Sequence, residues 1–109
     1  MTTFDDREKS FEAKFAHDED LRFRTVSRRD KLLGMWAADK LGLKGKEAET
    51  YALEVVKAEF QEPGDHDVQR KVAGDLAKKG VKIDDRELRR VMDELMAKAK
   101  QQIMSETKA

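Results

Sequence analysis

Apolar residues recur along most of the chain with the spacing of a buried helix face, and nowhere with the sustained alternation that is typical of strands. The clearest example ends the chain, where the apolar positions are Leu88, Val91, Met92, Leu95, Ala99 and Ile103. Asp84 precedes this stretch and Glu87 follows three residues later, a pair that is typical of a capping box. The pattern therefore predicts a helix that begins after Asp84.

Three further helices are predicted between the glycine- and proline-containing breaks at residues 42–45, 62–65 and 80–84. One covers Val26 to Leu41 as the second half of a long first segment. Another begins near Gly45 or Lys46, carries Phe60 on its apolar face and is stopped by Pro63, and the third starts at Asp65 or Asp67 and ends at Lys79. The expected core residues are Leu33, Trp36, Val55, Val72, Leu76, Leu88, Val91 and Leu95.

The pattern thus predicts an all-α fold: a four-helix bundle with a mobile, partly helical N-terminal extension. We expect the extension in residues 1–20, the four-helix domain in residues 21–104, and a frayed tail in residues 105–109. Gly34 lies inside the first predicted helix of the domain, where glycine costs about 1 kcal/mol relative to alanine. Close packing against a neighbouring helix would explain it.

The N-terminal extension carries a narrow aromatic stripe. At about 100° per residue, Phe11 and Phe15 each lie roughly 20° from the direction of Phe4 on a helix, and nearly all residues between them are charged. Two interpretations remain open. The stripe either docks on the domain's own core or is held for the groove of a partner. Three acidic residues at positions 18–20 lie where a new helix could be capped, which would separate the stripe from the core.

Composition narrows the possible functions. The chain has 109 residues, of which 42% are charged, yet 23 basic residues balance 23 acidic ones, so long-range attraction to nucleic acid or anionic lipid is not favoured. There is no cysteine, no signal-peptide pattern and no apolar run long enough to span a membrane. We expect a cytoplasmic protein without direct membrane insertion.

Residues typical of catalysis or cofactor binding are not arranged as either would require. The stretch from Gly42 to Glu47 lacks the first glycine and the hydroxyl residue of a phosphate-binding loop, and is better interpreted as a helix connection. His17 and His66 have no ligand partners at helical spacing, so no metal site is expected. We predict no catalytic residue, no cofactor and no enzyme activity.

The strongest local basic cluster consists of Arg22, Arg24, Arg28, Arg29 and Lys31. A solvated helix face is the simpler interpretation. The alternative function that it leaves open is a helical module that binds nucleic acid or a small ligand such as a nucleotide through this cluster, although no nucleic acid is expected because acidic residues lie close by.

Several stretches together resemble the alphaproteobacterial zeta subunit of the F-type ATP synthase. They are FDDREK at residues 4–9, FEAKFAHD at 11–18, RDKLLGMWAA at 29–38, the residues 51–52, 55–58 and 64–65, and MDEL at 92–95. The resemblance covers about residues 1–103.

The resemblance implies a regulatory subunit that inhibits ATP hydrolysis, with its N-terminal helix wedged at a catalytic interface. The implied partner is the catalytic head of the synthase, formed by its alpha, beta and gamma subunits, which would place the chain peripheral to the inner membrane. Carried onto this sequence, the aromatic anchors of the inhibitory segment would be Phe4, Phe11 and Phe15. Its polar contacts would come from Asp5, Asp6, Arg7, Glu8 and Lys9.

Overall fold

The computed structural model describes residues 3–60 and 66–107, with side chains described in 9–60 and 66–106. Within these residues the chain is all-α. Its five helices are α1 (Thr3–His17), α2 (Glu19–Lys40), α3 (Lys46–Ala58), α4 (His66–Lys78) and α5 (Asp85–Thr107). The predicted fold class is therefore confirmed, and the long first segment is divided into two helices.

Local sequence explains most helix ends. Asp84 caps α5 by accepting a hydrogen bond from the backbone N–H of Glu87 at 2.7 Å, as the capping box predicts. Gly80 follows α4 with φ of 83°, a conformation that glycine adopts without strain. Helix α3 ends at Ala58, before Phe60, which is 55% exposed, so the prediction that Phe60 lies on the buried face of that helix is wrong. Pro63 and Asp65 lie outside the described residues.

Helices α2 to α5 pack around one hydrophobic core, an arrangement compatible with the expected four-helix bundle. Of the expected core residues, Leu33, Val55, Val72, Leu76, Leu88 and Val91 are buried, whereas Trp36 and Leu95 are half-buried and pack against the others. Helix α5 continues through Ser105 to Thr107, beyond the expected domain limit, and residues 108–109 of the expected tail lie outside the described residues.

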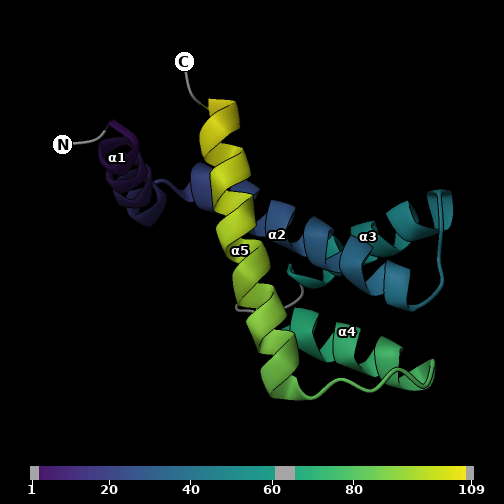
Figure 1. Ribbon diagram of the computed structural model, residues 1–109. Helices are drawn as coiled ribbons and strands as arrows, with labels where there is room; N and C mark the ends of the chain where they lie inside the picture. The colour runs from purple at the N-terminus through teal and green to yellow at the C-terminus, as the bar shows by residue number, and fades with distance from the viewer. Residues whose placement is uncertain (1–2, 61–65, 108–109) are drawn as a thin grey trace.

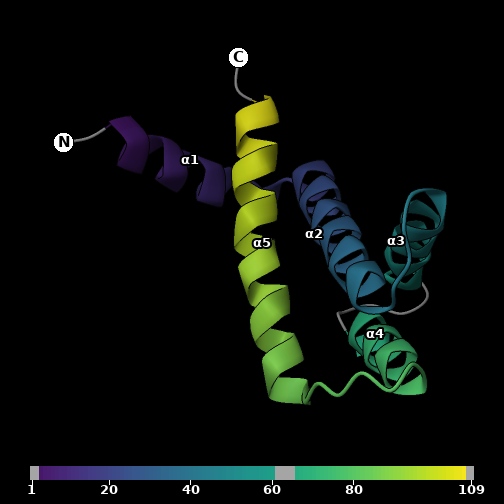
Figure 2. The ribbon, with the colours of Figure 1, turned by 45° about the vertical axis from the view of Figure 1, so that its right-hand side comes forward.

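Helix α1 lies apart from this core. In both ribbon views it lies on the opposite side of α5 from α3 and α4, close to the C-terminal end of α5 (Figures 1 and 2). None of its described residues belongs to the main core cluster. The first helix is thus attached to one end of a bundle that encloses its core without it.

Gly34 explains how closely α2 and α3 approach. A Cβ atom placed on Gly34 would lie 2.5 Å from the Cα atom of Ala52 on α3, closer than two carbon atoms can pack. The small residue expected to permit close helix packing therefore does so at this crossing.

Replacing this glycine should destabilise the bundle. We expect Gly34→Ala to lower the free energy of unfolding by about 1–3 kcal/mol, because the new methyl group forces the two helix backbones apart. Urea unfolding followed by circular dichroism measures the change.

Gly74 supplies the matched control, since it is a helical glycine at which an added Cβ atom would meet nothing within 4 Å. Gly74→Ala should raise the free energy of unfolding by about 0.5–1 kcal/mol through the better helix propensity of alanine. Equal effects of the two substitutions would contradict the close-packing explanation.

Candidate functional site

Helix α1 contains the whole segment that the sequence singled out. Residues 4–8 are part of this helix, but their side chains are not among those described. Lys9 is exposed, Phe11 is buried and Phe15 is half-buried. The structure thus tests the aromatic stripe at two of its three rings.

Phe11 packs against the rest of the molecule. Its side chain is only 6% exposed and forms a small cluster with Leu21 at the start of α2 and Ile103 near the end of α5. Met104 borders the same cluster. Of the two interpretations of the stripe, the structure shows the docked one for Phe11. The ring packs at this separate cluster, outside the main core.

Lys100 of α5 adds polar contacts to α1. Its Nζ atom lies 4.6 Å from the centre of the Phe15 ring and 3.4 Å from Oε1 of Glu12. Phe15 in turn meets Phe11 edge to face, with ring centres 6.3 Å apart. One lysine therefore makes both a cation–π contact and an ion pair with α1. We call Leu21, Lys100, Ile103 and Met104 the docking surface.

Asp18 separates α1 from α2. Its extended backbone (φ −107°, ψ 106°) interrupts the helix, and its Oδ1 accepts a hydrogen bond from the backbone N–H of Leu21 at 3.0 Å. Its own N–H donates to the carbonyl oxygen of Lys14 at 2.8 Å. A single residue thus forms the junction and caps α2 without help from the side chains of α1.

Arg28 holds the last turns of α5 against α2, beside the docking surface. Its guanidinium donates two hydrogen bonds to Glu106, at 2.7 and 2.9 Å, and one to Oε1 of Gln102 at 2.8 Å. The hydrogen bonds from Arg28 lower the pKa of the Glu106 carboxyl. These hydrogen bonds join the end of α5 to α2.

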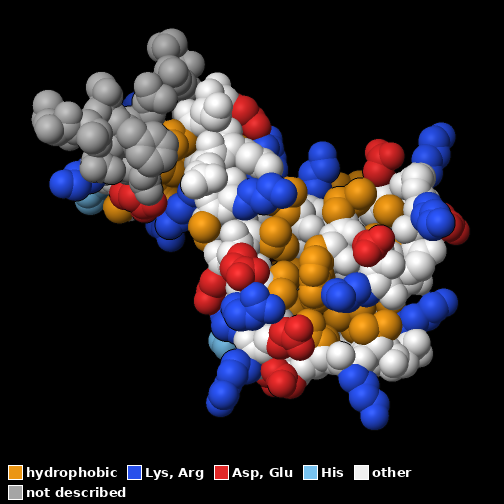
Figure 3. Space-filling model, viewed as in Figure 1, with side chains coloured by type: hydrophobic (Ala, Val, Ile, Leu, Met, Phe, Trp, Pro, Cys, Tyr) orange, Lys and Arg blue, Asp and Glu red, His pale blue; other side chains and the backbone are white. Residues whose placement is uncertain are grey.

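The basic cluster of residues 22–31 does not form one surface. Arg22, Arg24 and Lys31 are exposed, but Arg28 is engaged by Glu106, and Arg29 is only 1% exposed. Charges of both signs are scattered over the face of the molecule in Figure 3. The expectation of a solvated basic face is wrong for Arg28 and Arg29, and the alternative function that needs such a face loses two of its five cations.

Arg29 instead belongs to a buried ionic group. Its Nε atom lies 2.6 Å from Oδ1 of Asp30, which is fully buried, and its Nη2 atom lies 3.5 Å from Oε1 of Glu59 after the end of α3. Sequence reasoning missed this group because charged residues are expected at the surface. Its signal was the spacing of four between the buried α2 residues Leu21, Thr25, Arg29, Leu33 and Ala37.

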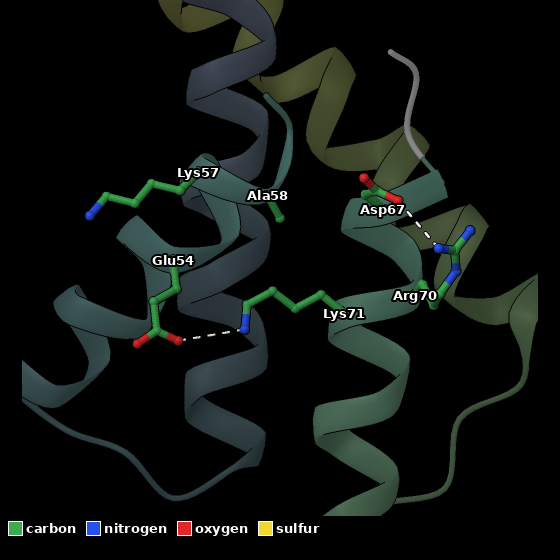
Figure 4. A pocket seen from close by; sticks show the side chains of 6 residues that line it. All are labelled: Glu54, Lys57, Ala58, Asp67, Arg70 and Lys71. Atoms are coloured by element: carbon green, nitrogen blue, oxygen red, sulfur yellow. Dashed lines mark hydrogen bonds and ion pairs between the residues drawn. The ribbon is translucent and has the colours of Figure 1, made fainter. Parts of the chain in front are cut away.

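A shallow hollow lies between α3 and α4, where charged side chains gather. Figure 4 shows Lys71 directed toward Glu54, Arg70 toward Asp67, and Lys57 away from α4. The Lys71–Glu54 pair measures 3.5 Å and the Arg70–Asp67 pair 3.3 Å. Beside the hollow, burial and a hydrogen bond to Asp75 raise the pKa of the Tyr51 hydroxyl, which donates to that carboxylate at 2.8 Å. The Lys71–Glu54 and Tyr51–Asp75 contacts join α3 to α4, whereas the Arg70–Asp67 pair lies within α4.

The described part of the chain holds neither a metal-binding group nor a membrane-spanning helix. No set of three or more His, Asp or Glu side chains there is placed to hold a metal ion. No helix among the described residues is both long and apolar enough to span a membrane.

The stretch from Gly42 to Glu47 includes the connection between α2 and α3, as the sequence predicted. Gly42 and Gly45 have φ of 79° and 57°, a conformation that glycine adopts without strain.

These features define a small helical module with a separately attached amphipathic helix. The chain belongs to the family of the ATPase inhibitor subunit zeta, whose model matches residues 1–102. Membership of this family means that the chain is a regulatory inhibitor rather than an enzyme, and it implies binding to the F-type ATP synthase.

The chain is also similar to a solved structure. A protein determined by NMR in solution is 49% identical, covers 79% of this chain and 98% of its own, and superposes with a TM-score of 0.69. A comparison with curated proteins gives no match.

The buried ionic group of α2 leads to a stability prediction. We expect Asp30→Ala to cost about 3–5 kcal/mol, because it removes the carboxylate that the Nε atom of the buried Arg29 contacts at 2.6 Å. Asp39→Ala, at an exposed position of the same helix, should change the free energy of unfolding by less than about 0.5 kcal/mol. Chemical unfolding measures both, and a similar loss in the two variants would contradict the role given to Asp30.

Proposed function

We propose that this chain inhibits ATP hydrolysis by inserting α1 into a catalytic interface of the synthase head, formed by the alpha, beta and gamma subunits. The observation that carries the proposal is the separate attachment of α1. Along the chain it is connected to α2 through the single residue Asp18, and it contributes none of its described residues to the main core. The helix can therefore leave its position while the core of α2 to α5 stays packed.

The amphipathic character of α1 supports insertion into a cleft with a polar rim. Phe11 and Phe15 lie on one edge and are in contact with each other, while Lys9, Glu12 and Lys14 are exposed. We propose Phe4, Phe11 and Phe15 as the anchors and Asp5, Asp6, Arg7, Glu8 and Lys9 as the polar contacts. Rings buried in an interface that must close during each catalytic cycle would hold it open and block rotation.

The docked position of Phe11 sets a condition on this mechanism. Residues 1–20 act as the inhibitory segment only after α1 leaves the docking surface, because the ring cannot be buried in two places at once. In this proposal the bundle of residues 21–104 stays outside the cleft, and the chain works on the cytoplasmic side, peripheral to the inner membrane.

Deleting residues 1–17 tests which part of the chain inhibits. The deletion should abolish inhibition of ATP hydrolysis by the purified catalytic head, while the cooperative thermal unfolding of the bundle remains, because the main core contains no described residue of α1. Full inhibition by the truncated chain would overturn the proposal.

A point substitution tests the aromatic anchor. Phe11→Glu should raise the concentration needed for half-inhibition by about tenfold or more, because it places a carboxylate in an apolar pocket. Ala13→Glu adds the same charge at an exposed position of α1 and should leave that concentration within about twofold. Equal inhibition curves for the two variants would show that Phe11 is not an anchor.

A further inference from the structure

The docking surface covers the same ring that the proposed function needs. Phe11 is buried against Leu21 and Ile103, and Lys100 contacts both Phe15 and Glu12. A catalytic interface that takes up the aromatic edge of α1 must therefore first separate it from α5. Docking and inhibition are mutually exclusive uses of one helix face.

We propose that the docked position of α1 is an autoinhibited state of this inhibitor, and that the docking surface sets how readily the chain acts on the head. The inference rests on the proposed function and adds its regulation. The docking surface competes with the head for α1, so weakening it strengthens inhibition. This is a gain of function that a purely structural role of the same residues does not predict.

The two surfaces compete through a population of undocked chains. Only a chain with α1 released can insert. The apparent affinity for the head therefore equals the affinity of the released form multiplied by the fraction of chains that are released. Release bares Leu21, Ile103 and Met104, and the main core stays closed because its residues come from α2 to α5. Helix α2 keeps its N-terminal cap, because the hydrogen bond from the backbone N–H of Leu21 to the Asp18 side chain involves no residue of α1.

Lys100 is the residue that acts on docking with the least effect on the bundle. Its ammonium group contacts Glu12 and Phe15, both on α1, and its side chain remains 30% exposed. Removing its charge eliminates one exposed ion pair and one cation–π contact, each of which stabilises weakly. The docked population should therefore fall without loss of core packing.

The first experiment measures how fast inhibition develops. Full-length Lys100→Gln, added to purified catalytic head during ATP hydrolysis, should inhibit about three- to tenfold faster than the original chain. Lys98→Gln, an equal charge change at an exposed position of α5, should inhibit at the original rate. An onset rate for Lys100→Gln equal to that of Lys98→Gln, or slower, would overturn the inference.

The second experiment locks α1 in its docked position. The chain has no cysteine, so Glu12→Cys and Lys100→Cys can be combined and joined by a short bifunctional reagent that forms reducible disulfides with both thiols. The two native side chains meet at 3.4 Å, so the introduced thiols lie within reach of such a reagent. The linked chain should not inhibit, and reduction should restore inhibition. Equal inhibition before and after reduction would overturn autoinhibition.

Failure of the two proposals can be told apart. Full inhibition by the chain that lacks residues 1–17 removes the proposed function itself. Loss of inhibition on that deletion, together with full inhibition by the linked chain, keeps α1 as the active segment and removes only the autoinhibited state.

Discussion

Among the described residues, α2 contacts all four of the other helices, and its close approach to α3 at Gly34 is the tightest constraint on how it packs. With no side chain at Gly34, the two helices pack almost backbone to backbone at Ala52. The same helix presents Leu21 to α1 and Arg28 to the end of α5. Helix α2 therefore packs closely on α3 at Gly34 and, toward its N-terminal end, contacts the helix that moves in the proposed mechanism.

The periodic parts of the fold were predictable because they depend on neighbours in sequence. The spacing of Leu88, Val91 and Met92 identified a helix face, and Asp84 marked the start of that helix. Residues 18–20 were named only as a possible cap, and the structure starts α2 there, after Asp18. The aromatic stripe of α1 was identified in the same way. Its partners were not, because Ile103 and Lys100 lie about ninety residues away and nothing local relates them to Phe11.

Arg29 and Asp30 show a second limit of sequence reasoning. Charge favours the surface so strongly that a run of basic residues is interpreted as a solvated face. Here the position on α2 decides instead: Arg29 follows Thr25 and precedes Leu33 at a spacing of four, so it faces inward, and Asp30 and Glu59 supply the carboxylates. Periodicity was the better guide than composition at this site.

The position of the docking surface near the C-terminal end of α5 also orders events during synthesis. Ile103 is added to the chain about ninety residues after Phe11. At about 5–20 residues per second, the nascent helix lacks its internal partner for roughly 5 to 18 seconds. The aromatic edge of α1 therefore stays uncovered in a nascent chain until Ile103 has been added and α5 can form.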